Sequence, residues 1–370
     1  MHVPFVDLKR TNDSLRDSIK EVLDAAISGS AFVGGRFLSD FEQRFALYCK
    51  TRFAVGTSSG TSALRLALQA CGVRAGDEIV TVPNTFIATV EAISQAGARS
   101  VFVDIDGRTG NMDMSLVKDA ISDRTRAILP VHLYGNPCDM PALLGITLGS
   151  KIAIIEDACQ AHGAEYLMDG EWVKTGSRGT AGCFSFYPTK NLGAFGEGGM
   201  FVSDSPEIAE RVKILRDHGQ REKNVHEIEG SNERLHSIQA AVLNVKLDFL
   251  DRWNEERRTL AQKYNELLAG LPISLPEPGR DVRHVYHLYV IRTEKRDALK
   301  SFLSSKGVDT AVHYPRPVHL QPAYSHLGYK EGDFPQSERW AKKILSLPIF
   351  VGLREEEIEY VADAIKAFFQ

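Results

Sequence analysis

From Phe53 onward the chain repeats one pattern: a short apolar segment, a turn that carries glycine, and a segment with apolar residues at helical spacing. The apolar segments that we expect to be strands span 53–57, 78–83, 100–106, 127–135, 151–157, 181–186 and 198–204. Segments such as 85–97 and 114–122 lie between them and show helical periodicity. This alternation predicts an α/β fold with a doubly wound, mostly parallel sheet and right-handed crossovers.

Length and composition narrow the class of protein. The chain has 370 residues, enough for two domains, and its 43% hydrophobic and 25% charged residues are ordinary for a globular protein. A net charge of −4 argues against a nucleic-acid surface. The first residues show no cationic lead before an apolar core, and no long apolar run occurs, so we expect no membrane association and a cytoplasmic location. Five separated cysteines without a CxxC pair indicate neither disulfides nor a metal site.

The two ends of the chain do not show the alternation of strands and helices that its middle shows. Helical patterns over 14–29 and 38–50 form a lead-in, and 235–269 is a long, unbroken helical pattern. After the proline-bearing loop 271–279, we expect a compact α+β unit with strands over 284–292 and 310–315 and helices over 295–307, 336–346 and 354–369. The prediction is therefore a large domain, 1–245, and a small domain, 246–370, joined by a long bridging helix.

A run of small hydroxyl residues opens the helix after the first strand. It comprises Ser58, Ser59, Gly60 and Thr61. Free N–H groups and the positive end of the dipole make a helix N-terminus an anion site, and the hydroxyls add donors. An ordinary N-cap, which uses one such residue, is the plainer interpretation. The series favours a phosphate site.

Two positions follow strand ends, where ligands of open α/β sheets bind. Phe86 could stack on a flat cofactor ring there, or be a core phenylalanine. Glu156 and Asp157 end the strand 151–157, and a buried Asp157 needs a cationic partner such as a protonated pyridine nitrogen. Gln160 could reach the phenolic oxygen of such a ring. We interpret His162 as a packing residue; metal binding by Asp157 and His162 is the alternative, without a third ligand at a recognisable spacing.

Lys190 lies between an apolar run and a glycine-rich turn. Residues 181–186 read as a buried strand, Pro188 ends it, and the glycines at 193, 196, 198 and 199 let backbone pass close to a bulky group. Most lysines extend to solvent, but burial disfavours the ammonium form, so the amine can form a Schiff base with an aldehyde cofactor. Ser185 could bind a phosphate of that cofactor.

Two loops are also candidates for binding. The loop 314–335 is long and rich in His, Tyr and Pro, which is typical of binding loops. The glycine turn 31–37 is either a helix connection or the edge of a substrate pocket.

The motifs together resemble the DegT/DnrJ/EryC1/StrS family of sugar aminotransferases over nearly the whole chain. The matching residues are Ser59–Thr61, Phe86, Glu156–Gln160, Ser185–Gly193 and Gly230–Leu235. The resemblance implies the fold-type I architecture of pyridoxal 5′-phosphate enzymes, with a seven-stranded, mostly parallel sheet in the large domain. It also implies a homodimer with the active site shared at the interface, and L-glutamate as amino donor.

The resemblance assigns a role to each matching residue. Lys190 is expected to hold pyridoxal phosphate and then to shuttle a proton. Asp157 is expected to keep the pyridine nitrogen protonated, so that the ring accepts electrons. The other cofactor contacts would be Gln160 on the phenolic oxygen, Phe86 on the ring face, Gly60, Thr61 and Ser185 on the phosphate, and Asn232 on the partner subunit's phosphate.

The segment 215–235 and the pair His313 and Tyr314 resemble the branch that aminates 3-keto deoxysugars linked to a nucleotide. By that resemblance Tyr187, Lys223, His313 and Tyr314 contact the sugar or the nucleotide. The branch usually has aspartate where this chain has His236. Amination of a C4-keto nucleotide sugar or of a keto-cyclitol, and a non-catalytic regulator on the same fold, are the alternatives.

Overall fold

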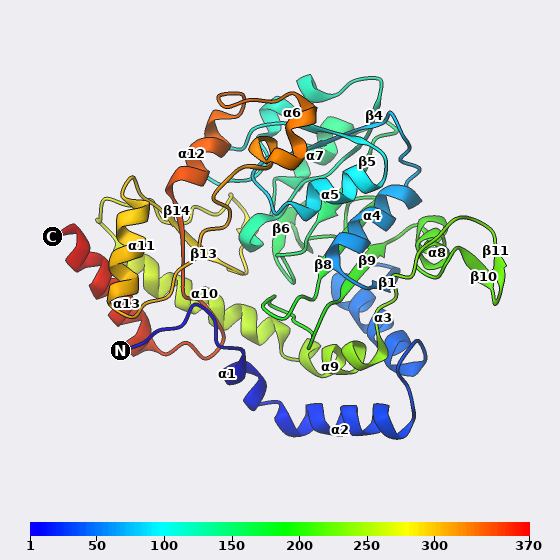
Figure 1. Cartoon of the computed structure of the whole chain (residues 1–370), viewed down its shortest axis with the longest axis horizontal. Coiled ribbons are helices and arrows are strands. Elements are labelled where there is room, and N and C mark those ends of the chain that lie inside the picture. The colour runs from blue at the N-terminus through cyan, green and yellow to red at the C-terminus, as the bar shows by residue number, and fades with distance from the viewer.

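The computed structural model describes residues 1–370 and contains the expected sheet. Its seven strands lie in the order β1, β9, β8, β5, β4, β2, β3 (Figure 1). Only β9 runs against its neighbours, so the sheet is mostly parallel, as predicted. The strands are β1 (Phe53–Thr57), β2 (Glu78–Thr81), β3 (Arg99–Phe102), β4 (Thr125–Ile128), β5 (Ala153–Asp157), β8 (Ala181–Ser185) and β9 (Gly199–Ser203).

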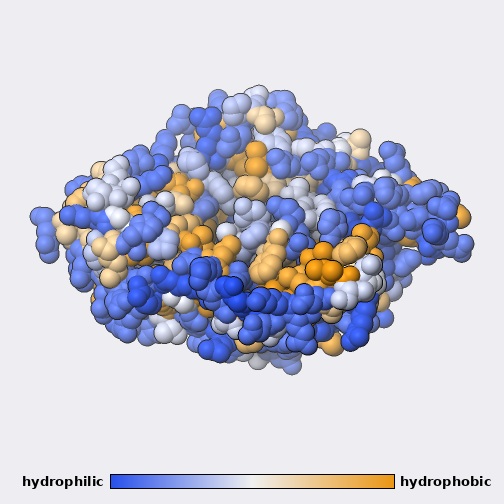
Figure 2. All heavy atoms as spheres, turned by 60° about the horizontal axis from the view of Figure 1, so that its bottom comes forward, coloured by the Kyte–Doolittle hydropathy of each residue, from blue (hydrophilic) through white to orange (hydrophobic).

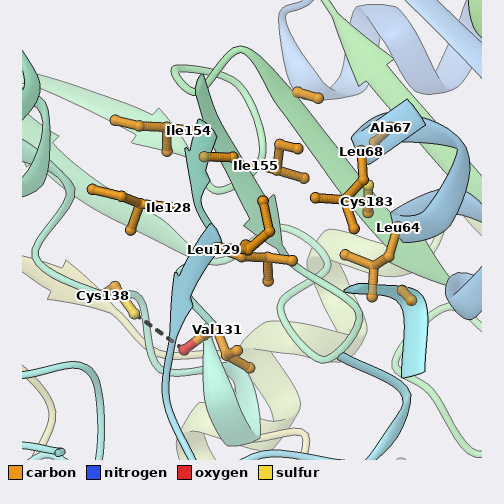
Figure 3. Close-up of a cluster of buried hydrophobic side chains, with 14 of the residues drawn as sticks. Leu64, Ala67, Leu68, Ile128, Leu129, Val131, Cys138, Ile154, Ile155 and Cys183 are labelled. Carbon is orange, nitrogen blue, oxygen red and sulfur yellow. Dashed lines mark hydrogen bonds between the residues drawn. The ribbon is translucent and has the colours of Figure 1, made fainter. Parts of the chain in front are cut away.

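Neighbouring residues of the central strands supply opposite faces of the sheet, because side chains alternate along a strand. Val55, Cys183 and Phe201 belong to the larger core on one face, whereas Phe184 and Met200 belong to the core on the other. Figure 3 shows part of the larger core, in which α4 packs its leucines against β5 and β8. Both faces are therefore buried under helices, as a parallel sheet requires.

The helices of this part of the chain are α1 (Leu8–Asp13), α2 (Arg16–Ser28), α3 (Arg36–Cys49), α4 (Gly60–Ala70), α5 (Ala88–Gln95), α6 (Met114–Ala120), α7 (Met140–Thr147), α8 (Pro206–Leu215) and α9 (Ser237–Leu247), with the short η1 (Leu133–Gly135). Two hairpins that we did not predict are β6 (Glu165–Met168) with β7 (Glu171–Lys174), and β10 (Gln220–Glu222) with β11 (Val225–His226). The second hairpin projects from the body next to α8 (Figure 1).

The C-terminal part is an α+β unit, as expected, but three of its elements differ from the prediction, one being the strand predicted over 284–292, which spans only Tyr289–Arg292. Its elements are α10 (Leu250–Leu268), β12 (Val282–Arg283), β13 (Tyr289–Arg292), α11 (Arg296–Ser305), η2 (Val318–Leu320), η3 (Pro322–Leu327), α12 (Pro335–Lys343), β14 (Ile344–Leu347) and α13 (Glu355–Phe369). The helix predicted over 336–346 ends at Lys343, because the next four residues pair with β13 as β14. The strand predicted over 310–315 is reduced to one bridge, Ala311 to Ser346.

The long helical pattern 235–269 is not one helix. A turn at Asp248 and Phe249 separates α9 from α10, so the prediction of an unbroken helix is wrong. Because the hydrophobic spacing continues across the turn, the sequence pattern does not reveal that the helix is interrupted there.

The first residues of the chain pack with the last ones. Val3 bridges Val308 and belongs to the core of the C-terminal unit, and Arg10 pairs with the buried Glu357 at 2.6 Å. The prediction of a large domain over 1–245 did not include this contact with the C-terminal unit. A domain boundary at residue 245 stays a prediction. None of the helices combines the length and the apolar character that crossing a membrane requires.

Candidate active site

Most of the predicted site residues meet at one cavity beyond the carboxyl ends of the parallel strands. The cavity has a volume of about 670 Å³. Of the predicted residues, those that line it are Gly60, Thr61, Phe86, Asp157, Gln160, Ser185, Tyr187, Lys190, His313 and Tyr314. They come from both parts of the chain, so the cavity lies where the large sheet meets the C-terminal unit.

Asp157 lies at the end of β5 and is 5% exposed. Its Oδ2 accepts a hydrogen bond of 2.8 Å from the Thr89 hydroxyl, and its Oδ1 accepts one of 3.2 Å from the Cys159 amide. Both donors are uncharged. A carboxylate buried in this way has lone pairs left for a cationic donor inside the cavity, and a protonated pyridine nitrogen fits that requirement.

Glu156 does not form a catalytic pair with Asp157, although the two are adjacent in the sequence. Because side chains alternate, Glu156 turns to the other face of the sheet, where it is fully buried. It accepts hydrogen bonds from the amides of Gly176 and Gly179, each at 2.7 Å, and lies 3.0 Å from His132 Nε2. Glu156 therefore anchors β5 to the loop before β8 and leaves Asp157 alone at the cavity.

Lys190 is partly buried in the turn after β8. Its backbone amide donates to the Tyr187 carbonyl at 2.8 Å, which fixes the turn that Pro188 begins. Burial lowers the pKa of Lys190, against the opposing effect of Cys159 and Asp157. Burial thus favours the neutral amine, which is the nucleophilic form.

Gly60 and Ser185 approach each other where α4 begins. A Cβ on Gly60 would lie 2.7 Å from Ser185 Cβ and 2.8 Å from Cys159 Sγ, so only glycine fits. Ser59 is the N-cap of α4 and accepts from the Ser62 amide at 3.1 Å. Ser59 is therefore an ordinary N-cap. The Thr61 hydroxyl, Ser185 and the helix N-terminus remain available to bind an anion in the cavity.

The ring side of the cavity is aromatic. Phe86 is 51% exposed, so it is not a core phenylalanine, and its ring centroid lies 5.4 Å from that of Tyr314. Gln160 accepts from the Tyr134 amide at 2.7 Å and donates to the Tyr314 hydroxyl at 3.2 Å. His313 lies 2.8 Å from the Ser346 hydroxyl, and burial lowers its pKa to about 4.

Two predicted residues lie outside the cavity of their own chain. Asn232 is exposed, in a segment held to α4 by Arg65, which donates to the Ser231 hydroxyl at 2.9 Å and pairs with Glu233. Lys223 is exposed in the projecting hairpin of β10 and β11. The turn 31–37 contributes no residue to the cavity, but the Phe32 carbonyl accepts from the Ser237 amide at the start of α9.

Sequence reasoning missed several residues that line the cavity, chiefly Thr89, Cys159, Glu197 and His287. Thr89 lies in the first turn of α5 and reads as an ordinary helical residue, so no sequence signal pointed to it. His287 sits in an apolar, aromatic run that we interpreted as a strand. His162, in contrast, packs between Phe184 and Phe186, as expected for a packing histidine. No group of three or more His, Cys, Asp or Glu side chains is arranged to hold a metal ion.

Two curated relatives match almost the whole chain. The pleiotropic regulatory protein of Geobacillus stearothermophilus is 44% identical, over 100% of this chain and 99% of the relative. The dTDP-3-amino-3,4,6-trideoxy-α-D-glucose transaminase of Streptomyces venezuelae is 45% identical, over 98% of this chain and 95% of the relative.

Solved structures agree with these relatives. The crystal structure of Streptomyces venezuelae DesV in complex with a ketimine intermediate is 44% identical, with a TM-score of 0.96 over 100% of this chain and 99% of that one. The structure of Bacillus subtilis NtdA with the cofactor PMP is 32% identical, with a TM-score of 0.91 over 100% of this chain and 85% of that one.

The family model described as the DegT/DnrJ/EryC1/StrS aminotransferase family matches residues 13–366. This match covers both parts of the chain and every residue of the cavity named above. It confirms the resemblance that the motifs carry, and with it the fold-type I architecture. The chain belongs to the DegT/DnrJ/EryC1/StrS aminotransferase family.

Proposed function

We propose that this protein transfers an amino group from L-glutamate to the C3 keto group of a nucleotide-linked keto-deoxysugar, with pyridoxal 5′-phosphate as its cofactor. The observation that carries the proposal is a single cavity that brings together a partly buried lysine, Lys190, and a buried carboxylate, Asp157. The transaminase of Streptomyces venezuelae, named for a 3-amino sugar, supports the ring position.

The residues present fit the cofactor. Asp157 is a buried acceptor suited to a pyridine N–H, and Thr61, Ser185 and the N-terminus of α4 line the same cavity as donors for a phosphate. Phe86 offers an exposed ring to stack on. When bound, pyridoxal phosphate supplies an aldehyde carbon that accepts an amine and a ring that accepts electrons.

The chain's own groups then have separate tasks. With the cofactor bound, Lys190 Nζ, whose neutral form burial favours, would hold it through the aldehyde carbon, with loss of water; once the donor's amine has displaced it, Lys190 would be free to accept and return the proton that leaves the donor. Asp157 would hold the proton on the pyridine nitrogen. The Thr61 and Ser185 hydroxyls, together with the N-terminus of α4, would bind the phosphate, and Gln160 would donate to the phenolic oxygen. Tyr187, His313 and Tyr314 contact the sugar or the nucleotide.

We also propose a homodimer in which Asn232 and Lys223 reach the partner's cavity. Both are exposed and lie outside the cavity of their own chain; Asn232 follows Ser231, which Arg65 of α4 binds, and Lys223 lies in the projecting hairpin of β10 and β11. Exposed apolar side chains at the end of α2 and beside α9 support a buried face there, namely Ile27, Phe32, Val33 and Phe195. Figure 2, which brings the side of α2 and α9 forward, shows hydrophobic residues gathered on that face. The cytoplasmic location stays a prediction from the sequence.

One relative is named as a regulatory protein, which keeps the alternative of a regulator in view. A regulator that had lost the chemistry would not need Lys190, Asp157 and Gln160 to line one cavity, and here they do. We therefore favour the transaminase. Amination at C4, or of a keto-cyclitol, would use the same cofactor residues.

The test is the visible spectrum of the purified protein with pyridoxal phosphate, before and after addition of L-glutamate. We expect a visible band that glutamate bleaches to a near-ultraviolet one, and its recovery when a nucleotide-linked 3-keto sugar is added. Lys190→Ala is the control and should show no protein-bound band. Bleaching without recovery by any keto sugar would disprove the acceptor class, and the absence of a band in the unmutated protein would disprove the enzyme.

A further inference from the structure

Few hydrogen bonds hold the segment that carries His313 and Tyr314. Only one of them reaches the backbone of residues 312–315, and in it the Tyr134 hydroxyl donates to the His313 carbonyl. Tyr134 lies in the turn η1, after β4. Because the side chains of His313 and Tyr314 line the cavity, their place there depends on this bond.

The side chains of this segment have hydrogen bonds of their own. His313 Nδ1 lies 2.8 Å from the Ser346 hydroxyl, in the C-terminal unit. The Tyr314 hydroxyl accepts from Gln160 Nε2 at 3.2 Å, on the side of the large sheet. These two bonds restrain the rings, whereas the bond from Tyr134 restrains the chain that carries both rings.

Tyr134 is itself held in place by both parts of the chain. It is buried, and its φ of +61° is a left-handed conformation that costs free energy in a residue other than glycine. Its amide donates to Gln160 Oε1 at 2.7 Å. On the other side, the Leu288 amide donates to the Tyr134 carbonyl at 3.4 Å, and the Val285 amide donates to the Gly135 carbonyl at 3.1 Å. The turn is therefore fixed between the large sheet and the C-terminal unit.

Tyr134 reaches two sides of the cavity without lining it. Its amide binds Gln160, which we assign to the phenolic oxygen of the cofactor, and its hydroxyl binds the backbone of His313, which we assign to the substrate. Gln160 Oε1 faces an N–H and must be the acceptor, so Gln160 Nε2 is the atom that donates to Tyr314. One tyrosine thus spans the distance between a cofactor contact and the substrate contacts.

We infer that Tyr134 is a positioning residue, which fixes where the sugar contacts His313 and Tyr314 lie relative to the cofactor. The inference rests on the proposed function, because the roles of His313, Tyr314 and Gln160 come from it. A positioning role requires that loss of the Tyr134 hydroxyl weakens the reaction with the sugar and spares the binding of the cofactor, since the backbone amide that holds Gln160 remains.

Two matched substitutions separate positioning from stability. Tyr134→Phe removes the hydroxyl and keeps the backbone amide. Tyr264→Phe is the control, because Tyr264 is also buried and its hydroxyl also donates to a backbone carbonyl, that of Pro348 at 3.0 Å, but it does not line the cavity. Each variant loses one buried hydrogen bond of the same kind. Thermal unfolding of both variants checks that they fold.

The two half-reactions are measured separately. We expect Tyr134→Phe to keep the visible band of the holoenzyme and to keep the rate of bleaching by L-glutamate within about twofold. The KM for the nucleotide-linked 3-keto sugar should rise about five- to tenfold, because one neutral hydrogen bond contributes up to about a factor of ten. Tyr264→Phe should leave all three quantities unchanged. A crystal structure of the cofactor-free Tyr134→Phe variant gives a readout without activity, in which residues 312–315 should shift while η1 stays in place.

A second background tests whether Tyr134 acts through the segment. If it does, Tyr134→Phe should raise the KM for the sugar less in Tyr314→Phe than in the otherwise unmutated protein. Additive effects, equal losses in both half-reactions, an unchanged KM, or an unmoved segment in the crystal structure would each overturn the inference. Absence of a visible band in the unmutated holoenzyme would be a failure of the proposed function instead.

Discussion

The Thr89 hydroxyl donates to Asp157 Oδ2 at 2.8 Å, joining the first turn of α5 to the end of β5. Thr85 lies 2.7 Å behind it, hydroxyl to hydroxyl. We expect Thr89→Val, which keeps the shape and loses the donor, to reduce kcat/KM about tenfold, because the carboxylate is less firmly oriented. Thr89→Ser should keep most of the activity. Steady-state kinetics of the pair test this, and equal rates in both variants would contradict it.

Asp157→Asn should leave the protein folded and slow the reaction by at least about two orders of magnitude. An amide cannot hold the proton on the pyridine nitrogen as a carboxylate does, so the ring becomes a poorer electron acceptor. Single-turnover bleaching with L-glutamate measures the step directly. A rate near that of the unmutated enzyme would mean that another group protonates the ring.

Gly60→Ala should weaken cofactor binding at least about tenfold, because its Cβ would meet Ser185 and Cys159 below 3.0 Å and the start of α4 must shift. Gly145→Ala, in α7, is the matched control, since a Cβ at that position has open space. Titration of the cofactor-free protein with pyridoxal phosphate gives both constants. Equal affinities would show that the site does not depend on this close approach.

A mixed dimer tests the shared site. Neither Lys190→Ala nor Asn232→Ala alone should give full activity. Co-expressed, they form a heterodimer in which one site has an intact Lys190 and the partner's intact Asn232. We therefore expect the purified heterodimer to have about half the activity of the unmutated dimer, and the unseparated mixture about a quarter. If Asn232 serves the cavity of its own chain, the heterodimer will have only about half the activity of the Asn232→Ala dimer.

The stabilisation of the fold by the ion pair between Arg10 and Glu357 should depend on pH. The guanidinium groups of Arg10 and Arg354 beside Glu357 lower the pKa of that carboxyl to about 2. A lowered pKa stabilises the fold above the carboxyl's ordinary range, and the contribution is lost as the pH falls from about 4.5 toward 2. Glu357→Gln should thus lower Tm at pH 7, and the difference should shrink below about pH 4. A difference that is constant with pH would indicate lost packing instead.

The parts of the fold that depend on short-range pattern could be predicted from the sequence. The run 181–186, ended by Pro188, became β8 and placed Lys190, and the run ending in Asp157 became β5. Phe86 could be placed because it follows a strand end. Each of these positions follows from the direction of the sheet.

What escaped prediction depends on contacts between distant segments. Residues 344–347 continue the helical spacing of α12, and only their pairing with β13 makes them a strand. His287 contacts Asn191, and Asn191 contacts Asn254, although the three lie far apart in the sequence. Glu156 and Asp157 are adjacent carboxylates in the sequence, and only the alternation of side chains in the sheet places them on opposite faces.

The bridge between Val3 and Val308 also constrains the order in which the molecule can be finished. Val3 is synthesised long before Val308, so the two residues can pair only after all strands of the large sheet have been synthesised. The core that Val3 completes also holds Tyr289 of β13, and His287, which lines the cavity, lies just before that strand. The cavity therefore becomes complete only after the C-terminal unit, which supplies His287, His313 and Tyr314, has been synthesised.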